Sequence, residues 1–466
     1  MVASEVLPLA KTGGLADVVG ALPAALQALG DEVAVVIPRY GFIDLKDLRR
    51  VWDNAPVYLG LARYDTSIYL YPGGFPIYLV DCPLLFDRPG LYGEAGADYP
   101  DNHIRFAVFA RAALSVARWL FRADVLHCHD WQAGLVPVWL RTTHSTDPTF
   151  LGTKTLFTIH NLGYRGLFPP SALVDAAIDP AVYRPDGLEF YGQVSYIKGG
   201  IVFADALSTV SPTYAREIQT PEFGWGLDGA LRARSPVLHG ILNGVDYAEW
   251  NPETDPYIPA RYSADDLSGK SVCKLELLAE FGLPSHAIEE PLIGIVARFA
   301  WQKGTELIAQ IAGEILDLGM YLIVLGSGET EYEDWFRRLA AENPDRIAVR
   351  IGFDNATAHR IEAGADLFLM PSRYEPAGLN QMYSLRYGTV PVVRATGGLN
   401  DTIEESTGFK FTEYSGSALV AALRTAALAF ADRAAWEALM RRGMQQDFSW
   451  GRSAAAYSAL YRQLTA

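Results

Sequence analysis

Short apolar runs alternate with longer amphipathic segments along most of the chain, and this alternation predicts strands separated by helices. The expected strands cover 33–37, 125–127, 155–159 and 206–210 in the first half, and 293–296, 321–325, 347–351, 367–370 and 390–393 in the second. A further strand is expected at 2–6, before the first helix. Continuous apolar strands separated by helices indicate parallel sheets that are covered on both faces. The fold class is therefore α/β.

The alternation stops between about residues 247 and 291, where the chain is irregular and rich in proline. One helical stretch, at about 267–281, lies within this segment. Proline-rich polar segments between two apolar series are where domain boundaries fall. We therefore expect an N-terminal Rossmann-like domain over 1–247, a connector and C-terminal Rossmann-like domain over 248–447, and a last segment over 448–466 with a helix at 452–464.

The charge balance narrows the class of protein. Lys and Arg number 39 against 54 Asp and Glu, a formal net charge of −15, which argues against a nucleic-acid partner. The three cysteines, Cys82, Cys128 and Cys273, form no CxxC pair, so a reducing, cytoplasmic compartment is expected and no zinc cluster. The chain start lacks the basic region of an export signal, and the apolar segment 418–430 is too short to span a bilayer, so no membrane partner is expected.

A short motif occurs twice, as Thr12-Gly13-Gly14 and as Thr396-Gly397-Gly398. Each copy is expected to follow a strand and to open a helix, where backbone N–H groups and the helix dipole favour an anion. Lys11, beside the first copy, supports the anion site. A pair of tight strand-to-helix turns without a ligand is the other interpretation, and both stay open.

Two cations, Arg298 and Lys303, follow the expected strand at 293–296. The carboxyl end of a parallel strand is where open α/β sheets bind ligands, so a guanidinium and an ammonium at this place could clamp a diphosphate. Two solvated loop cations are the alternative. The segment lacks the GxxxxGK[ST] pattern, which disfavours a P-loop ATPase.

Glu375 follows the expected strand at 367–370. A helix is expected to begin near Pro376, a residue suited to a first turn, and to end before Gly388. Glu375 would then stand at the entrance of this helix. It would either cap the helix through the dipole or, next to Arg373, hold a ligand.

Histidines stand at two strand ends in the first half of the chain. His127 and His129 share one face of a strand, which would suit a metal, but no third ligand follows at a plausible spacing, so no metal site is predicted. His160 with Asn161 is a better pair for recognising the hydroxyls of a sugar. Aromatic residues that suit stacking on carbohydrate, or simply core packing, are Tyr214, Phe223, Trp225 and Trp250.

Taken together, these motifs resemble the bacterial glycogen synthase and plant starch synthase family. The segments that carry the resemblance are 11–18, 127–131, 158–161, 220–228, 243–246, 298–304 and 375–381. The resemblance covers essentially the whole chain. It implies a GT-B fold, in which two Rossmann-like domains with parallel sheets face each other across a deep interdomain cleft and the last helix packs back on the first domain.

Enzymes of this family transfer glucose from ADP-glucose to the 4-hydroxyl end of an α-1,4-glucan, with retention and without a metal or other cofactor. The resemblance implies that Arg298 and Lys303 neutralise the leaving diphosphate and that Glu375 holds the glucose hydroxyls. The implied catalytic residues are Glu375, Arg298, Lys303 and His160. The implied substrate-binding residues are Lys11, Gly13, Gly14, Asp130, Asn243, Phe353, Gly378, Leu379, Asn380, Thr396 and Gly397. Phe353 falls where an aromatic residue flanks the nucleobase.

Other classes of protein fit the sequence less well. A glucan-binding regulator that kept the fold and lost turnover is the main alternative, and the joint presence of Arg298, Lys303 and Glu375 argues against it. A dinucleotide-dependent oxidoreductase is disfavoured because neither strand-to-helix loop carries GxGxxG. A pyridoxal-dependent phosphorylase would share the fold type. No motif indicates an oligomeric state.

The chain departs from the family pattern at two places. Ala377 stands where the family often has cysteine, which removes a thiol from the segment and leaves Glu375 in place. Relatives usually carry several residues before the segment that matches 1–6. We therefore expect this chain to begin inside its first strand, and a longer start to raise its thermal stability.

Overall fold

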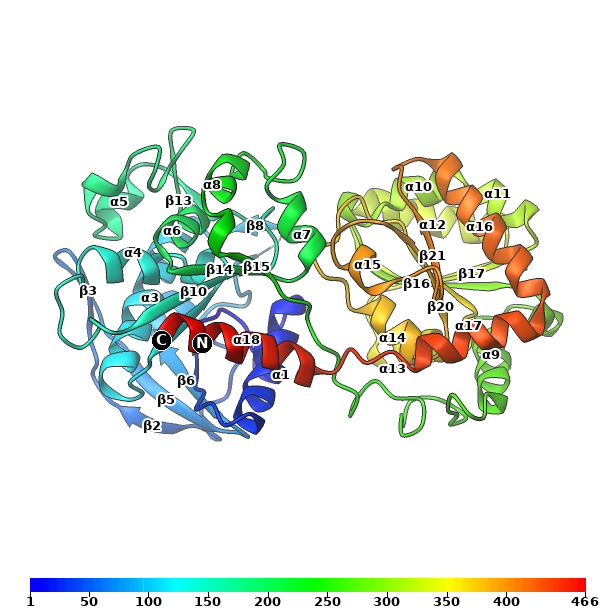
Figure 1. Ribbon diagram of the computed structural model, residues 1–466, viewed down its shortest axis with the longest axis horizontal. Coiled ribbons are helices and arrows are strands. Elements are labelled where there is room, and N and C mark those ends of the chain that lie inside the picture. Colours follow the sequence, from blue (N-terminus) through cyan, green and yellow to red (C-terminus); the bar gives the residue numbers. More distant parts are fainter. Residues whose placement is uncertain (95) are drawn as a thin grey trace. The chain divides into compact units, whose positions relative to one another are not determined.

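The computed structural model describes residues 1–94 and 96–466. The chain forms two compact units: unit 1 consists of Met1–Gly244 and Trp450–Ala466, and unit 2 of Val245–Ser449. Figure 1 shows strands flanked by helices in both units. The two chain segments that pass between the units are paired with each other, since Val245 N donates to Phe448 O at 2.7 Å.

Unit 1 contains the elements that precede the connector, together with the last helix. Its strands are β1 (Val35–Pro38), β2 (Arg49–Trp52), β3 (Val57–Leu59), β4 (Ala62–Tyr64), β5 (Ser67–Pro72), β6 (Pro76–Asp81), β7 (Gly93–Glu94), β8 (Ala97–Asp98), β9 (Val125–His129), β10 (Lys154–Ile159), β11 (Leu167–Phe168), β12 (Glu189–Phe190), β13 (Gln193–Ser195), β14 (Ala206–Thr209) and β15 (Leu238–Gly240). Its helices are α1 (Gly14–Ala28), α2 (Pro83–Phe86), α3 (Asn102–Trp119), α4 (Leu135–Arg141), α5 (Ala172–Asp175), α6 (Tyr196–Phe203), α7 (Pro212–Glu217), α8 (Asp228–Ala233) and α18 (Trp450–Thr465).

The main sheet of unit 1 consists of two four-stranded parts, β1-β6-β5-β2 and β15-β14-β10-β9. All pairs in the second part are parallel, but β5 pairs antiparallel with β6, and β2 with β5. The expectation of a wholly parallel sheet is therefore corrected at this edge. The tight connection between β5 and β6, with Pro72 opposite Pro76, requires a hairpin, because a parallel pair needs a long crossover.

The strand expected at 2–6 is wrong in its length. Val2 makes single parallel bridges to Val36 in β1 and to Cys128 in β9, and it thereby joins the two parts of the sheet. After Glu5 the chain turns, and Val6 and Ala10 pair with each other. The apolar pattern of 2–6 is nonetheless explained by burial, because all five of these residues lie in the interior.

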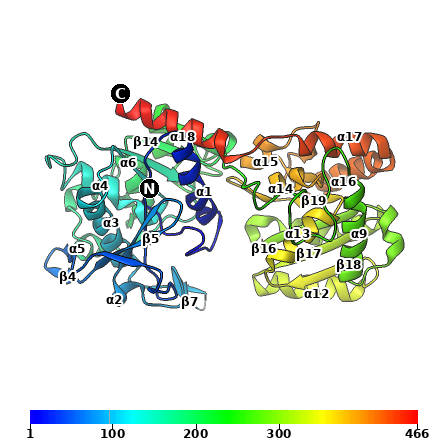
Figure 2. The same ribbon diagram turned by 90° about the horizontal axis from the view of Figure 1, so that it is seen from below.

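The last helix belongs to unit 1. Figure 1 and Figure 2 both show α18 lying beside α1. The two helices share an apolar cluster, in which Leu22 and Leu26 of α1 accompany Ala454, Tyr457 and Leu460 of α18. Burial of these side chains ties the end of the chain to the helix that carries the first glycine motif.

Unit 2 contains six strands among the residues that the structure describes, and all of them are parallel. They are β16 (Leu292–Phe299), β17 (Tyr321–Gly328), β18 (Ile347–Ile351), β19 (Leu367–Met370), β20 (Val390–Arg394) and β21 (Phe409–Phe411). The helices are α9 (Ser268–Glu280), α10 (Thr305–Gln310), α11 (Ala312–Asp317), α12 (Thr330–Glu342), α13 (Asn355–Gly364), α14 (Asn380–Arg386), α15 (Gly397–Thr402), α16 (Gly416–Ala431) and α17 (Arg433–Met444).

The strand order in unit 2 is β18-β17-β16-β19-β20-β21. This is the doubly wound order 3-2-1-4-5-6, in which the direction of winding reverses between the first and fourth strands, here β16 and β19. Ligands in such sheets bind beyond the carboxyl ends of the strands at that reversal. The topology therefore places the candidate residues after β16 and β19 at the expected binding position of the fold.

The central strands of unit 2 are buried on both faces, which explains the long apolar runs in their sequences. Ile293 and Leu322 point into one cluster with α10, α11, α12, α16 and α17, whereas Leu292 and Ile323 point into the other cluster with α9 and α13. Successive side chains of a strand point to opposite faces of the sheet, so adjacent residues such as Leu292 and Ile293 enter different clusters. All the strands expected from apolar runs, apart from the one at 2–6, are confirmed. No helix in the described ranges combines the length and hydropathy that crossing a bilayer requires.

Candidate active site

The candidate residues fall in two sets, one in each unit, and in each set several residues lie at carboxyl ends of parallel strands. In unit 1, Asp130 follows β9 and His160 follows β10. In unit 2, Lys303 ends a short 3-10 turn after β16, and Glu375 follows β19. Both placements agree with the rule for ligand binding in open α/β sheets.

An ion pair links the two loops at the reversal of unit 2. Lys303 Nζ lies 2.6 Å from Glu375 Oε2, and Ser372 Oγ donates to the same oxygen at 3.0 Å. The Glu375 residue is 5% exposed, so its carboxylate depends on these partners. Lys303, whose side chain is 22% exposed, can still be reached from outside. The pair thus holds a cation in a fixed position at the ligand-binding edge of the sheet.

Glu375 does not stand at a helix entrance, and that expectation is wrong. The helix α14 begins at Asn380, and residues 376–379 precede it as an irregular segment. Gly378 adopts φ +64°, a left-handed conformation that a helix cannot contain, so the helix begins only after it. The expected end is confirmed, because α14 stops at Arg386 and Gly388 adopts φ +65°.

The second glycine motif packs against the Glu375 segment. A Cβ on Gly397 would lie 1.9 Å from Glu375 O, and a Cβ on Gly398 would lie 1.9 Å from Ala377 O. Gly398 N also donates to Glu375 O at 3.1 Å. The glycines at the start of α15 therefore serve close packing, and they fix the backbone of Glu375. The amide of Gly398 is occupied by carbonyl oxygens and does not point to an anion.

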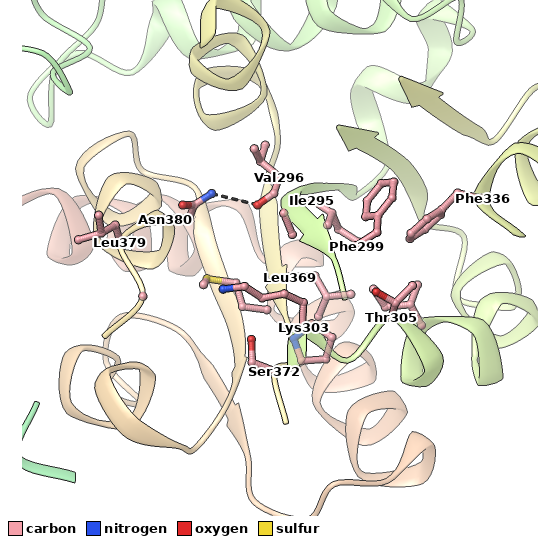
Figure 3. A pocket seen from close by; sticks show the side chains of 15 residues that line it. Ile295, Val296, Phe299, Lys303, Thr305, Phe336, Leu369, Ser372, Leu379 and Asn380 are labelled. Carbon is pink, nitrogen blue, oxygen red and sulfur yellow. Dashed lines mark hydrogen bonds between the residues drawn. The ribbon is translucent and has the colours of Figure 1, made fainter. Parts of the chain in front are cut away.

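The loop after β16 is fastened to the loop after β19. Gly304 adopts φ +73°, and a Cβ on it would lie 2.1 Å from Pro371 O, so only glycine fits. A cavity of about 60 Å³ lies beside these loops. Figure 3 shows Lys303 and Ser372 along one part of its wall and Asn380 along another, where Asn380 Nδ2 donates to Val296 O at 3.1 Å.

Arg298 and Phe353 are open to solvent. Arg298 forms no ion pair with any other residue that the structure describes, and its side chain is exposed. Phe353 is 77% exposed and follows Gly352, whose φ of +129° carries the chain away from the end of β18. No hydrogen bond within the described part of the chain joins either residue to the pair of Lys303 and Glu375. Both side chains are thus available to a ligand.

In unit 1, Asp130 and His160 are brought together. Asp130 adopts φ +55°, and its Oδ1 accepts from His160 N at 2.8 Å. The His160 ring is 3.0 Å, Nε2 to Nδ1, from the ring of His129. His127 is engaged elsewhere, with Tyr461 OH at 2.7 Å and Thr158 Oγ1 at 2.5 Å. These contacts account for the histidine pair without a metal.

Burial determines the protonation states of Asp130, His160 and His129. It raises the pKa of Asp130 to about 7, although the amides of His160 and Asn161 partly offset the effect. Burial lowers the pKa of His160 to about 3 and holds the pKa of His129 well below its ordinary value. The imidazoles are therefore neutral at neutral pH. A neutral imidazole both donates and accepts hydrogen bonds, which suits sugar hydroxyls.

The first glycine motif is held by a carboxylate that the sequence did not single out. Glu5, which is 3% exposed, accepts from Thr12 N and Thr12 Oγ1, each at 2.6 Å, and from Gly13 N at 3.3 Å. Tyr92 OH donates to the same carboxylate at 2.5 Å. Hydrogen bonds to an ionised group are the strong ones, so Glu5 fixes the loop. A Glu within an apolar run, at a position predicted to be strand interior, was the available signal.

The loop that Glu5 fixes is open on its outer side. A Cβ on Gly13 or on Gly14 would meet no atom within 4 Å, so packing does not require glycine there. Lys11 Nζ lies 2.6 Å from Asp17 Oδ1 and remains half exposed. The two glycine motifs therefore differ, because the first presents bare backbone to solvent and the second is buried against its neighbours.

Asn243 carries an unpartnered polar atom. The residue is 5% exposed, and its Oδ1 has no hydrogen-bond partner among the residues that the structure describes. It follows β15, at the same carboxyl edge of the unit 1 sheet as Asp130 and His160. A buried carbonyl oxygen without a partner is costly, so a bound group at this edge is indicated.

A larger cavity, of about 380 Å³, lies at the opposite edge of the unit 1 sheet. Its walls include Val33 and Ala34, which precede β1, and Asp124 and Val125 at the start of β9. These are the amino-terminal ends of parallel strands, and none of the candidate site residues lines the cavity. The site is therefore the carboxyl edge, where the polar residues converge.

Comparisons with known proteins agree with this architecture. Residues 1–233 match the family model of the starch synthase catalytic domain, and residues 284–437 match that of glycosyl transferases group 1. The glycogen synthase of Anaeromyxobacter sp. (strain Fw109-5) is 53% identical over 478 residues, which cover 100% of this chain and 99% of that protein. The glycogen synthase of Koribacter versatilis (strain Ellin345) is 50% identical over 473 residues, or 99% of this chain and 97% of that protein.

A solved structure is similar over the same length. The catalytic domain of starch synthase IV from Arabidopsis thaliana, bound to ADP and acarbose, is 34% identical with a TM-score of 0.91, and the match covers 100% of this chain and 98% of that chain. The chain belongs to the glycogen and starch synthase family of glycosyltransferases. Its fold is GT-B, and its function is glucosyl transfer in glycogen or starch synthesis.

Proposed function

We propose that the enzyme transfers glucose from ADP-glucose to the 4-hydroxyl at the non-reducing end of an α-1,4-glucan, with retention and without a metal ion. The choice of donor and acceptor is supported by the related starch synthase IV structure, which is described as bound to ADP and acarbose. The single observation that carries the chemistry is the ion pair of Lys303 and Glu375, at 2.6 Å, at the winding reversal of unit 2.

Arg298 and Lys303 stabilise the departing diphosphate. The bond between C1 of glucose and the diphosphate oxygen breaks, and its electron pair stays on that oxygen. Lys303 is held by Glu375 before the substrate binds, and a cation fixed in advance is worth most where such charge develops, because it needs no reorganisation at that moment. The proposal assigns the stabilisation of this charge to the two cations and not to a metal ion. The acceptor oxygen bonds C1 on the same face, and its proton passes to the leaving oxygen.

Glu375 positions the sugar and does not become covalently attached to it. Both hydrogen bonds that the described residues make to its carboxylate end on Oε2, from Lys303 and Ser372. Oε1 is thereby left to accept from a glucose hydroxyl. A carboxylate held by an ammonium group is a weak nucleophile, so a double displacement of the glycosidase kind is disfavoured.

The other candidate residues take supporting roles in this proposal. In unit 1, Lys11, Gly13 and Gly14 contact the sugar nucleotide through the open loop, and His160, Asp130 and Asn243 contact sugar hydroxyls. In unit 2, Phe353 flanks the nucleobase. The residues that line the substrate beside Glu375 are Gly378, Leu379, Asn380, Thr396 and Gly397. We also propose a cytoplasmic location, since Cys82, Cys128 and Cys273 are buried free thiols, as a reducing compartment maintains.

The test uses the purified full chain with glycogen and either ADP-glucose or UDP-glucose, in the presence and absence of EDTA, and measures released nucleoside diphosphate. ADP release that depends on glycogen, exceeds UDP release at matched concentrations and survives EDTA is expected. Equal or faster turnover of UDP-glucose contradicts the donor assignment, and loss of turnover with EDTA contradicts metal independence. Glycogen binding without turnover would instead identify a regulator.

A further inference from the structure

Two aromatic residues in unit 1, the exposed Tyr191 and the half-buried Trp225, adopt a backbone conformation that aromatic residues rarely take. Tyr191 has φ +48° and Gly192 has φ +82°, and together they connect β12 to β13, where Phe190 pairs with Gln193. A two-residue hairpin turn with positive φ at both positions strongly favours Asn-Gly or Asp-Gly. A tyrosine in the first position of such a turn is strained.

The second residue repeats the arrangement. Trp225 has φ +50° and is followed by Gly226 at φ +81°, just before α8. The two turns touch, since a Cβ on Gly226 would lie 3.1 Å from Tyr191 Cε2 and 3.2 Å from Phe190 Cζ. Figure 1 allows β13 and α8, which flank these turns, to be located in unit 1.

Arg165 joins the two turns. Its guanidinium carbon lies 5.6 Å from the ring centroid of Phe190 and 5.6 Å from that of Trp225, and its Nη1 donates to Trp225 O at 3.3 Å. Tyr164, the residue before it, is 56% exposed. We call Tyr191 and Trp225, with Arg165 between their turns, the aromatic platform.

Folding alone does not explain the conformation of Tyr191. Tyr191 is 80% exposed, so its strained conformation is not offset by burial of the ring. Strain that persists without a packing gain is a mark of functional positions. Isolated exposed aromatics are common, but here the turns of two strained aromatics adjoin each other, and Arg165 lies against Trp225 and against Phe190, the neighbour of Tyr191.

The surroundings of the platform favour a neutral ligand. Glu189, whose Oε1 accepts from Gly192 N at 2.8 Å, and the exposed Glu222 flank the two turns. These two carboxylates outnumber the one guanidinium, so a phosphate-bearing ligand is repelled. A sugar ring presents an apolar face to an aromatic ring and hydroxyls to a guanidinium. An α-glucan therefore matches the platform in both respects.

The platform is also close in sequence to a residue of the candidate active site. Arg165 lies five residues beyond His160, in the loop that leaves β10 at the carboxyl edge of the sheet. A polymeric acceptor extends beyond the reacting end, so a subsite in the same unit raises the local concentration of that end. This geometry points to our inference, which rests on the proposed function: the aromatic platform is a stacking subsite for the α-1,4-glucan acceptor, outside the bond-forming centre.

The experiment uses Tyr191→Asn, because asparagine is favoured at this turn position and the variant should melt no lower than the parent. Tyr58→Asn is the matched control, since Tyr58 is an exposed tyrosine of the same unit, on β3. Migration in gels with and without glycogen, in the absence of any sugar nucleotide, gives the dissociation constant for glycogen. Tyr191→Asn should raise this constant about 2- to 10-fold, the size of one aromatic stacking contact, and Tyr191→Phe should not.

Kinetics separates the platform from the bond-forming centre. The KM for glycogen should rise in Tyr191→Asn, whereas the KM for maltotriose and for ADP-glucose should stay at the values of the parent and of Tyr58→Asn. Unchanged glycogen affinity, or an equal loss for maltotriose and glycogen, overturns the inference. The gel contains no sugar nucleotide, so the measured glycogen affinity does not depend on whether the parent releases ADP. Failure of the proposed function is detected separately, in the assay of ADP release.

Discussion

Lys303 and Glu375 form an ion pair, at 2.6 Å, between the loops that follow β16 and β19. These are the strands between which the winding of the unit 2 sheet reverses. The fold thus brings a cation and a carboxylate, far apart in sequence, to its ligand-binding position. The carboxylate also fixes the ammonium before any substrate arrives.

Substituting the two cations should separate catalysis from stability. Arg298→Ala and Lys303→Ala should each lower kcat about 10²- to 10³-fold, the usual cost of losing one charge-stabilising group. Only Lys303→Ala should also lower the melting temperature, because it leaves the buried Glu375 carboxylate without its cation. Steady-state kinetics and thermal unfolding of both variants check this. Near-normal kcat in either variant removes that residue from the mechanism.

Glu375→Gln tests whether this side chain positions or attacks. The amide keeps an acceptor for Ser372 but loses its charge, so kcat should fall and the product should remain the α-anomer. Mass spectrometry of the parent enzyme, quenched during turnover with ADP-glucose, should find no glucosyl adduct on Glu375. An adduct on this residue would show that the reaction is a double displacement.

Glu5→Gln should weaken binding of the sugar nucleotide, because Glu5 fixes the loop that contains Lys11. The carboxylate accepts from Thr12, Gly13 and Tyr92, and an amide nitrogen would face donors where an oxygen now accepts. The KM for the sugar nucleotide should rise about tenfold, consistent with lost hydrogen bonds to a charged group, while the KM for maltotriose changes little. Tyr92→Phe removes one donor and should have a smaller effect. A folded Glu5→Gln enzyme with a normal donor KM would refute this role.

The two glycine motifs should respond differently to alanine. Gly13→Ala should keep the parent melting temperature, because Gly13 has extended φ of −159° and open space around it, but should weaken donor binding. Gly397→Ala should melt lower, because φ is +44° and the new Cβ would collide with Glu375 O. Thermal unfolding and donor titration distinguish the two. Equal melting losses would contradict the assigned difference.

The ionisation of Asp130 should be visible in the stability of the fold. Its pKa is about 7 in the folded chain against an ordinary 3.8, so between these values the folded state keeps a proton that the unfolded state releases. The unfolding free energy contributed by this group therefore falls as pH rises through this window. Asp130→Asn has no carboxyl group to titrate at this position, so its unfolding free energy does not contain this pH-dependent contribution. Between about pH 4 and 7, the unfolding free energy of the variant should therefore rise relative to that of the parent, by at most about 4 kcal/mol.

Denaturant unfolding of both proteins across that range provides the measurement. His160, with its pKa lowered to about 3, contributes a slope of opposite sign, but it is present in both proteins and cancels in the difference. Parallel curves for the parent and Asp130→Asn would show that Asp130 is not held protonated by burial.

The fold was predictable because its strands are buried on both faces. Neighbours such as Leu292 and Ile293 enter clusters on opposite faces of the sheet, so both must be apolar. Burial on both faces therefore produces a continuous apolar run in the sequence. The antiparallel β5 and the short pairing at Val2 were missed, because strand direction and length depend on partners that are distant in sequence.

The site was predictable only in part. Arg298, Lys303 and Glu375 follow predicted strands, so their common edge could be inferred, but the contact between Lys303 and Glu375 depends on the strand order of the sheet. The helix start after Glu375 was misplaced because Pro376 is a permissive signal, whereas the left-handed Gly378 is decisive. Glu5 was not predicted because its importance depends on buried hydrogen bonds, and Tyr191 because it is distinguished by its backbone φ angle. Neither feature can be inferred from the residue type alone.

The most direct test of the central claim is proton NMR of maltoheptaose incubated with ADP-glucose, comparing the parent with Lys303→Ala and Arg298→Ala. The parent should add glucose through an α-1,4 linkage and release one ADP for each glucose added. Both variants should do so at rates lower by about 10²- to 10³-fold. A β-linked product, release of ADP without chain growth, or undiminished transfer in the variants would contradict the account.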